Sequence, residues 1–190
     1  NKEDKRKLLY HLIRNEGLKQ LLVFSRTKHG ADNVVKALKK NGVNAEAIHG
    51  DKSQTARQRV LDQFKNKEIT VLVATDIAAR GIDIESLPYV INFDLPNIPE
   101  TYVHRIGRTG RAGNGGISIS FCGKDEEVYW KDILKLIKVN VKTIKDHPFP
   151  WKENIPNPDA KPDLRNKKKP EGESKSRKSE ASKKNKKRWY

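Results

Sequence analysis

Hydrophobic and polar positions alternate with two different periods along the first 139 residues, one typical of strands and one typical of helices. Short apolar or alternating runs, typical of β-strands, occupy 20–25, 45–50, 70–75, 89–94 and 116–122. Stretches with helical spacing of apolar residues lie around them, over 5–17, 31–42, 53–68, 99–107 and 125–139. This alternation predicts an α/β fold, with an open, mostly parallel sheet and helices on both faces.

Residues that start and stop helices support these boundaries. Gly17 and Gly42 are placed to end the first two helices, because glycine readily adopts the backbone conformation that follows a helix. Ser53 can cap the third helix with its hydroxyl group, and Pro99 suits the first position of the fourth. The acidic run DEEV (125–128) is interpreted as the start of the last helix, where acidic side chains are favourable.

The composition changes after Asp146. Residues 147–190 are rich in Pro, Lys, Ser, Asn and Glu and have little apolar surface to bury, so we expect them to be mostly disordered. We divide the chain into a globular domain (1–146), a Pro-rich linker (147–165) and a basic tail (166–190). Within the linker, Phe149 and Trp151 could pack back onto the domain.

Charge narrows the range of partners. The chain has 40 Lys and Arg against 24 Asp and Glu, a formal net charge of +16. Residues 166–190 contribute eleven basic and three acidic side chains, which is half of that net charge. This balance favours polyanionic partners, nucleic acid or anionic lipid.

Other compositional features concern location. Cys122 is the one cysteine, which excludes an intrachain disulfide and fits a reducing, cytoplasmic setting. No apolar run approaches the ~20 residues that span a bilayer, and no signal peptide is visible, so we expect no membrane association. The sequence contains no methionine, from which we expect a fragment of a longer protein.

Ligands of parallel sheets bind at the carboxyl ends of the strands, so the loops after Ser25, Gly50, Thr75 and Asp94 are the candidate site. A P-loop would need G-x-x-x-x-G-K-[ST] after a strand. The nearest match, GDKS at 50–53, lacks that pattern, and the five histidines are scattered. The chain alone is therefore expected neither to hold a nucleotide in the usual manner nor to bind a metal.

Arginines with little bulk around them are the strongest chemical signal. In YVHRIGRTGRAG (102–113), Arg105, Arg108 and Arg111 recur every third residue with small residues between them. A guanidinium group requires an anionic partner. The small residues between the arginines leave room for a large anion, or for another protein surface, to approach closely. The alternative is structural, because arginines also tie loops to carboxylates.

Two further arginines follow predicted strands or loops. Arg80 stands between ATDIAA and GID, where we expect a tight loop of backbone N–H groups that, with one guanidinium, suits a phosphate. A turn with a structural salt bridge is the alternative. Arg57 lies one turn into the helix after HGDKSQ, and its alternative is a solvated helix face.

Together these segments resemble a known family. HRIGRTGR (104–111), VATDIAARGID (73–83), LVFSRTK (22–28) and IHGDKSQTAR (48–57) resemble, in order and spacing, the second RecA-like lobe of a DEAD-box RNA helicase of superfamily 2. The resemblance covers residues 1 to about 145. The basic tail and the HPFPW segment resemble the bacterial RhlE-like group. A first lobe, with the P-loop and the Asp-Glu-Ala-Asp box, is missing from this sequence.

The resemblance implies roles around ATP, which with Mg²⁺ would be held mainly by the first lobe. Arg108 and Arg111 match arginine fingers that reach the γ-phosphate, and His104 matches a histidine that connects them to the first lobe. Asp83, with Gly81 nearby, matches the position that contacts the ribose.

It also implies RNA contacts. Arg57, Thr75 and Arg80 match positions that hold RNA phosphates. More loosely, so do Arg26, Thr27 and Gly50. Contacts of this kind go to the backbone and carry little sequence information. Arg105 is expected to form an internal salt bridge instead.

The implied function is that of the second lobe of an ATP-dependent RNA helicase, inactive as an isolated fragment. Two alternatives remain open at this point. One is a basic module that binds or chaperones RNA without ATP. The other is the corresponding lobe of a DNA translocase.

Overall fold

The computed structural model describes residues 1–80, 82, 84, 86–110 and 115–150. The described strands are β1 (Leu21–Phe24), β2 (Ala45–Ile48), β3 (Val71–Ala74), β4 (Tyr89–Asn92) and β5 (Ile117–Ser120). The α-helices are α1 (Lys5–Asn15), α2 (Lys28–Lys40), α3 (Gln54–Lys65), α4 (Asp76–Ala79), α5 (Pro99–Ile106) and α6 (Glu127–Ile137). A short 3₁₀ turn, η1 (Lys124–Glu126), precedes α6. The predictions for Trp151 and for the tail 166–190 lie outside the described residues.

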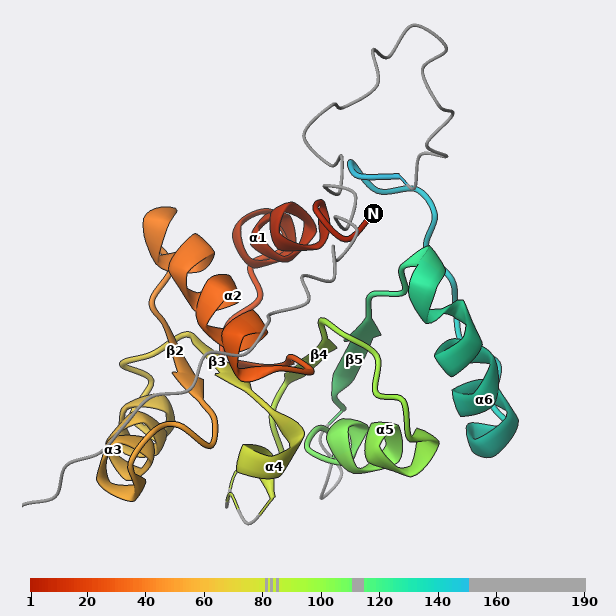
Figure 1. The fold of residues 1–190 in the computed structure, drawn as a ribbon. Helices are drawn as coiled ribbons and strands as arrows, with labels where there is room; N and C mark the ends of the chain where they lie inside the picture. The colour runs from red at the N-terminus through yellow and green to blue at the C-terminus, as the bar shows by residue number, and fades with distance from the viewer. Residues whose placement is uncertain (81, 83, 85, 111–114, 151–190) are drawn as a thin grey trace, which may run out of the picture. The chain divides into compact units, whose positions relative to one another are not determined.

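Within this part of the chain the strands form one five-stranded sheet in the order β2-β3-β1-β4-β5. Every pairing is parallel, and Leu21 of β1 lies opposite Val71 on one side and Tyr89 on the other. The α/β prediction is confirmed, and the sheet is parallel throughout. Because the strands are parallel, their carboxyl ends all lie at the same end of the sheet (Figure 1).

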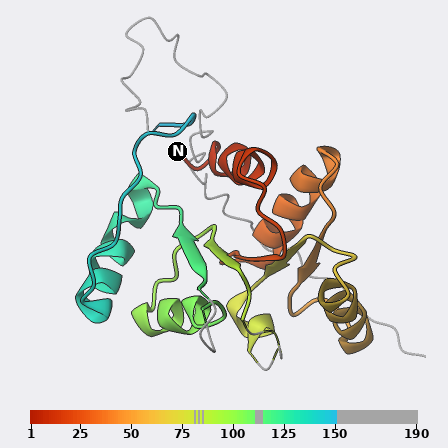
Figure 2. The same ribbon diagram turned by 180° about the vertical axis from the view of Figure 1, so that it is seen from behind.

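Helices cover both faces of the sheet, as predicted (Figures 1 and 2). Successive strand residues point to opposite faces. Val23 packs with Leu9 of α1 and Val34 of α2 in one buried cluster. Its neighbour Phe24 packs with Phe64 of α3 in a second cluster on the other face. Fully burying a side chain of this size contributes roughly 1.5–3 kcal/mol, so the two clusters hold the layers together.

Most of the residues that were predicted to begin or end a helix do so in the structure. The Ser53 hydroxyl accepts a hydrogen bond from the Ala56 amide at 3.2 Å, and Pro99 occupies the first turn of α5. Gly17 and Gly42 follow α1 and α2 with φ values of 65° and 72°, a region that favours glycine. The second helix begins earlier than predicted, because the Thr27 hydroxyl caps it by accepting from the Gly30 amide at 3.0 Å.

The prediction of a tight loop after Thr75 is wrong, because the chain forms a helical turn there. Residues Asp76–Ala79 make a single helical turn, α4, whose first intrahelical bond runs from the Ala79 amide to the Thr75 carbonyl at 2.9 Å. Thr75 is the residue before the turn, but its side chain makes no capping bond. Ala78 and Ala79 are buried, and their small size lets α4 lie close to the sheet.

The segment after α6 has no regular secondary structure up to Pro150. Lys138 ends α6 in a left-handed conformation, with φ at 50°. Further along, the Phe149 ring meets the His11 ring of α1 edge-on, with the ring centroids 6.2 Å apart. The prediction that Phe149 packs back onto the domain is therefore confirmed. None of the described helices combines the length and apolar character needed to cross a membrane.

Candidate functional site

Arginines from two other elements bond to the carboxyl end of α4. Arg57 of α3 donates from NH2 to the Ala78 carbonyl at 3.2 Å. Arg108, just beyond α5, donates from NH1 to the Ile82 carbonyl at 3.0 Å and from NH2 to the Ala79 carbonyl at 3.5 Å. The last carbonyls of a helix lack partners within it and carry partial negative charge. The two guanidinium groups satisfy these carbonyls and hold α4 in place.

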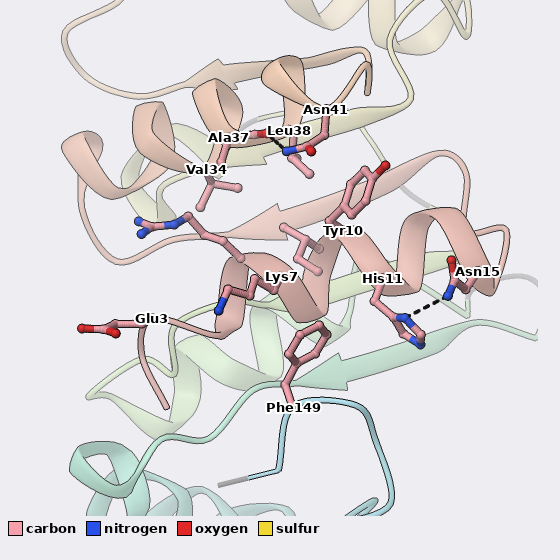
Figure 3. Close-up of a pocket in the computed structure, with 12 residues that line it drawn as sticks. Glu3, Lys7, Tyr10, His11, Asn15, Val34, Ala37, Leu38, Asn41 and Phe149 are labelled. Atoms are coloured by element: carbon pink, nitrogen blue, oxygen red, sulfur yellow. Dashed lines mark hydrogen bonds between the residues drawn. The ribbon is translucent and has the colours of Figure 1, made fainter. Parts of the chain in front are cut away.

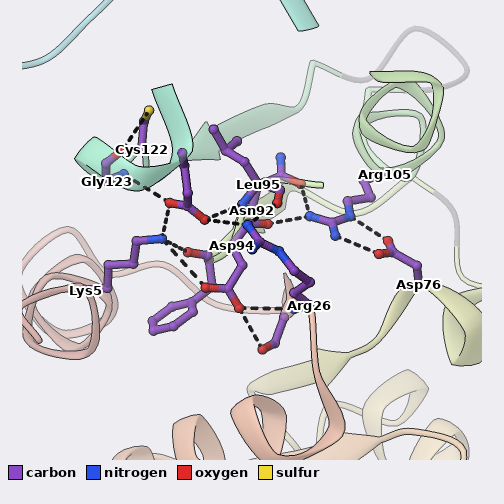
Figure 4. A network of polar contacts seen from close by, with 12 residues as sticks. Lys5, Arg26, Asp76, Asn92, Asp94, Leu95, Arg105, Cys122 and Gly123 are labelled. Carbon is purple, nitrogen blue, oxygen red and sulfur yellow. Dashed lines mark hydrogen bonds and ion pairs between the residues drawn. The ribbon is translucent and has the colours of Figure 1, made fainter. Parts of the chain in front are cut away.

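Arg105 fixes the other end of α4. It is 1% exposed and forms a two-pronged ion pair with Asp76, with Nε to Oδ1 at 2.6 Å and NH2 to Oδ2 at 2.8 Å. Its NH1 donates to the Asn92 side-chain oxygen at 3.1 Å and to the Asp94 carbonyl at 2.6 Å (Figure 4). The guanidinium also lies 5.0 Å from the centroid of the Phe24 ring. The predicted internal salt bridge is confirmed.

The structure brings His104, Arg108 and Arg80 together. They line one small cleft of about 30 Å³ with Asp76, Thr101 and Arg105. His104 and Arg80 are exposed and Arg108 is half-buried. Among the described residues no side-chain hydrogen bond or ion pair engages Arg80 or His104.

The cleft tests whether these residues fit a nucleotide. Pockets that enclose a small ligand measure ~300–1,000 Å³, so this cleft cannot enclose one. The donors nevertheless suit phosphate oxygens, since a guanidinium offers five N–H groups and Arg108 uses two of its nitrogens. The cleft therefore presents guanidinium donors at an open surface, and its role as a phosphate site stays a prediction.

The residues predicted to hold RNA most directly also meet at α4. Thr75 precedes α4, Arg80 follows it, and Arg57 contacts it from α3. Arg57 also donates from NH1 to the Gln54 side chain at 3.0 Å, whereas its buried Nε has no hydrogen-bond partner among the described residues. A buried donor without a partner is uncommon. Because this nitrogen is buried, it is not open to a ligand in this conformation.

The more loosely predicted RNA residues are arranged differently. The Arg26 guanidinium turns towards Glu126, with NH2 at 3.1 Å from Oε1, and also donates to the Leu95 carbonyl at 2.8 Å. The Thr27 hydroxyl is used as the cap of α2. Gly50 is exposed, and a Cβ placed there would have no atom within 4 Å. The structure thus does not bring the Arg26 guanidinium to α4, where Arg57, Thr75 and Arg80 meet.

Sequence reasoning missed a buried polar network at the carboxyl ends of β1 and β4 (Figure 4). Glu126 is 3% exposed and accepts from the Lys5 ammonium group, the Leu95 amide at 3.0 Å and the Arg26 guanidinium. Asp94 accepts from the Ser25 hydroxyl at 2.9 Å and the Arg26 amide at 3.0 Å. These polar contacts lie at the carboxyl ends of the neighbouring strands β1 and β4. The sequence had predicted a ligand site there, in the loops after Ser25 and Asp94.

The interpretation of DEEV as the start of the last helix is confirmed, and Glu126 has a further role that the sequence did not reveal. Glu126 does accept from the Gly123 amide at 3.0 Å, as an acid at the start of a helix should. Its main contacts, however, are with the distant Lys5 and Arg26. No sequence signal pairs these residues, because they lie far apart along the chain.

Several predicted site residues are not tested by this geometry. Gly81, Asp83 and Arg111 lie outside the described residues. In the part of the chain that is described, no group of three or more His, Cys, Asp and Glu side chains could hold a metal ion. The expectation that this lobe binds no metal stays a prediction.

A parallel sheet with arginines gathered at the carboxyl ends of its strands defines the chain as a RecA-like α/β lobe. Residues 4–113 match the family described as the helicase conserved C-terminal domain, so the chain belongs to that family. Within it, the chain is the C-terminal lobe of a DEAD-box helicase. It is 48% identical, over 124 residues and 65% of its length, to the ATP-dependent RNA helicase CshA of Limosilactobacillus reuteri.

Solved structures agree. The crystal structure of a DEAD box protein from Methanococcus jannaschii matches 76% of this chain and 40% of that one, with a TM-score of 0.71 and 41% identity. Saccharomyces cerevisiae Dbp5 bound to RNA and ADP BeF3 matches 71% of this chain and 36% of that one, with a TM-score of 0.65 and 37% identity. The chain spans 25% of the length of CshA and 31% of another bacterial relative. The RhlE-like assignment stays a prediction.

Proposed function

We propose that this lobe is half of an RNA-dependent ATPase that unwinds RNA when joined to its first lobe. The observation that carries the proposal is the convergence on α4 of Arg57 from one side and Arg108 from the other. One helical turn lies between Arg57, assigned to RNA, and Arg108, assigned to ATP, whereas Arg80, also assigned to RNA, shares the cleft with Arg108. The relatives are named ATP-dependent RNA helicases, which supports the same reaction.

On the RNA side, Arg57, Thr75 and Arg80 would hold phosphates of one strand. Arg80 is exposed and has no partner among the described residues, so an incoming phosphate displaces only water from it. Arg26, Thr27 and Gly50 would extend this surface, and Arg26 would have to leave Glu126 to join it. Contacts to phosphates select for nucleic acid but not for sequence.

On the ATP side, Arg108, Arg111 and His104 would complete a site whose other wall is the first lobe. Gly81 and Asp83 are assigned to the ribose. ATP, bound with Mg²⁺ on the first lobe, would supply the phosphoryl group that is transferred to water. The arginines would stabilise negative charge on that group, an effect worth ~10³–10⁵ in rate where it has been measured. Arg108 already lies in the cleft, held by backbone carbonyls of the α4 loop.

The two ligands would act together through closure of the lobes. Each would bind both lobes, and so each would favour the closed form. Closure would bend one RNA strand and separate a short duplex, and hydrolysis would release it. This lobe would therefore bind the RNA backbone and supply the arginines that stabilise the transferred phosphoryl group, while the first lobe would hold the nucleotide.

The test joins this chain to a DEAD-box first lobe and measures ATP hydrolysis with and without RNA. We expect turnover that rises with RNA, and none from the isolated chain. RNA binding that is indifferent to ATP would favour the ATP-independent RNA module instead. Stimulation by DNA equal to that by RNA would favour the translocase lobe.

A further inference from the structure

Three of the residues assigned to RNA follow three adjacent strands of the sheet. Thr27 follows β1, Gly50 follows β2, and Thr75 follows β3, which lies between the other two. The Thr75 amide donates to the Ile48 carbonyl at 3.2 Å, so backbone hydrogen bonding holds Thr75 to the end of β2. In the described sheet β1 and β2 are not neighbours. Contacts outside the sheet must therefore set how the segments with Thr27 and Gly50 lie relative to each other.

Polar side chains join the start of α2 to the loop after β2. Lys28, the first residue of α2, pairs with Asp51, with Nζ at 2.7 Å from Oδ2. One turn later, Asp32 Oδ1 lies 3.0 Å from His49 Nε2 and 3.9 Å from Lys52 Nζ. The later turns of α2 pack against α1 instead (Figure 3). The start of α2 is thus tied to the loop that contains the RNA-assigned glycine.

His49 is the buried member of this set. Its side chain is 4% exposed, and its Nε2 must carry the proton of the bond to Asp32, because a carboxylate only accepts. The other ring nitrogen, Nδ1, is buried and has no hydrogen-bond partner among the described residues. The contact with Asp32 therefore orients the ring, and with it the backbone that leads into Gly50.

Gly50 is a glycine that the chain itself does not require. It is exposed, and a Cβ placed there would meet no atom within 4 Å. Its φ is not positive either, unlike those of Gly17 and Gly42. Neither crowding nor backbone conformation therefore accounts for the missing side chain. A glycine also lets a ligand approach the backbone closely, and RNA is the ligand assigned to this position.

The carboxylates of Asp32 and Asp51 lie on a surface assigned to a polyanion. Their side chains are 48% and 57% exposed. Ion pairs at such exposure contribute little to stability, and a carboxylate near phosphates opposes the binding of nucleic acid. Neither stability nor attraction of RNA accounts for these two residues, whereas holding the loop after β2 does.

We propose that Asp32 is a positioning residue for RNA binding, which holds the loop after β2 through His49 so that the backbone of Gly50 faces an RNA phosphate. Lys28 and Asp51 hold the same loop from the first residue of α2. A loop that is already fixed loses less conformational freedom when it binds. This inference rests on the proposed function, because it concerns the RNA surface of the same lobe.

The test measures the affinity of the intact chain for a fluorescein-labelled oligouridylate by fluorescence anisotropy across salt concentrations. Asp32→Ala removes a negative charge, so a carboxylate without a positioning role predicts tighter binding. Positioning predicts the opposite sign, a loss of about tenfold, which is the value of one hydrogen bond to a charged group. The slope of log K against log salt should also fall by ~0.7, as for one lost phosphate contact. Asp32→Asn keeps an oxygen that accepts from His49, and should bind RNA at least as tightly as the original chain.

Two further variants accompany this series. Asp62→Ala makes the same charge change on α3, where the Asp62 carboxylate accepts from Gln58 of the same helix, and it should not weaken RNA binding. Gly50→Ala should weaken RNA binding without lowering the melting temperature, because the added methyl group meets RNA and no atom of the chain.

RNA binding by Asp32→Ala as tight as that by Asp62→Ala would overturn the proposal. So would a lower melting temperature of Asp32→Ala with an unchanged salt slope, which would leave it a role in the fold alone. Arg57→Ala and Arg80→Ala separate this inference from the proposed function. If they weaken RNA binding while Asp32→Ala and Gly50→Ala do not, only the positioning role is wrong. If none of the four weakens it, the RNA surface itself is wrong.

Discussion

Arg105 and Asp76 form a two-pronged ion pair that joins α5 to the first residue of α4, with both hydrogen bonds at 2.8 Å or less. The guanidinium is 1% exposed, whereas Asp76 is more open. Planar guanidinium and carboxylate groups match each other in this geometry. Because Asp76 starts α4, the pair sets the position of the turn against which Arg57 and Arg108 lie.

Arg105→Ala is therefore expected to destabilise the domain. Removing one partner of a buried ion pair costs about 3–5 kcal/mol. Each kcal/mol corresponds to about 2–4 °C in a domain of this size. Asp76→Asn, which keeps the shape of the side chain, should also lower the melting temperature. Arg59→Ala is the matched exposed control, and its melting temperature should not change. A melting temperature for Arg105→Ala equal to that of Arg59→Ala would contradict this role.

Arg80→Ala and Arg57→Ala should both weaken RNA binding by the isolated lobe, but with different effects on stability. Arg80 is exposed, so its replacement should leave the melting temperature unchanged. Arg57 bonds to the Ala78 carbonyl, and losing a typical hydrogen bond costs about 0.5–1.5 kcal/mol. Each lost phosphate contact should also take ~0.7 off the slope of log K against log salt for single-stranded RNA. An unchanged slope in both variants would remove these residues from the RNA surface.

Arg108→Lys and Arg111→Lys should each sharply reduce ATP turnover in a two-lobe protein, while RNA binding by the isolated lobe stays nearly intact. Lysine keeps the charge but loses the planar fork that engages two phosphate oxygens. Melting curves measured beside the ATPase rates separate chemistry from stability. A large fall in melting temperature with a proportionate loss of activity would mean that these arginines only support the fold.

Deleting residues 166–190 should weaken RNA binding about equally for all RNA sequences. The segment carries eleven basic side chains, and contacts between lysine or arginine and phosphate are sensitive to salt. The salt dependence of binding should therefore become shallower. The comparison is a titration of the full chain and the truncated chain across salt concentrations. Identical slopes would show that the tail does not contact RNA.

Cys122 should react slowly with alkylating reagents at neutral pH. Although Cys122 is exposed, partial desolvation of its thiol raises the pKa, and the nearby carboxylates of Glu126 and Glu127 raise the pKa further. A raised pKa leaves less of the reactive thiolate at a given pH, so the rate should rise only at higher pH than for a free thiol. Iodoacetamide labelling followed by mass spectrometry gives this profile. Glu127→Gln should move the profile to lower pH, whereas Asp132→Asn, on the same helix, should leave it in place.

The strands and most helix ends could be read from the sequence because they depend on neighbouring residues. Val23 and Phe24 belong to an apolar run, and their burial on opposite faces follows from the alternation of a strand. Ser53 and Pro99 act within one turn of their helices. The turn α4 was missed because four residues carry too little periodicity to identify a helix, although Thr75 and Asp76 are residues that often begin one.

The arginines of HRIGRTGR show where sequence reasoning stops. Arg105 and Arg108 have the same chemistry and similar small neighbours. Arg105 lies on the buried side of α5 and meets Asp76, whereas Arg108 lies beyond the end of α5, in a cleft with His104 and Arg80. The sequence suggested this division through a family resemblance. The contacts of Arg105 confirm its half of the division, and the role of Arg108 stays a prediction.

The sequence by itself determined an alternating α/β chain, its helix caps and the motifs that place it among DEAD-box proteins. Only the tertiary structure decided the strand order, the pairing of Lys5 and Arg26 with Glu126, and the contact of the Phe149 ring with His11 of α1. The physical reason is separation along the chain. Caps and apolar periods act over a few residues, whereas ion pairs and grooves form between residues that only packing of the sheet and its helices brings together.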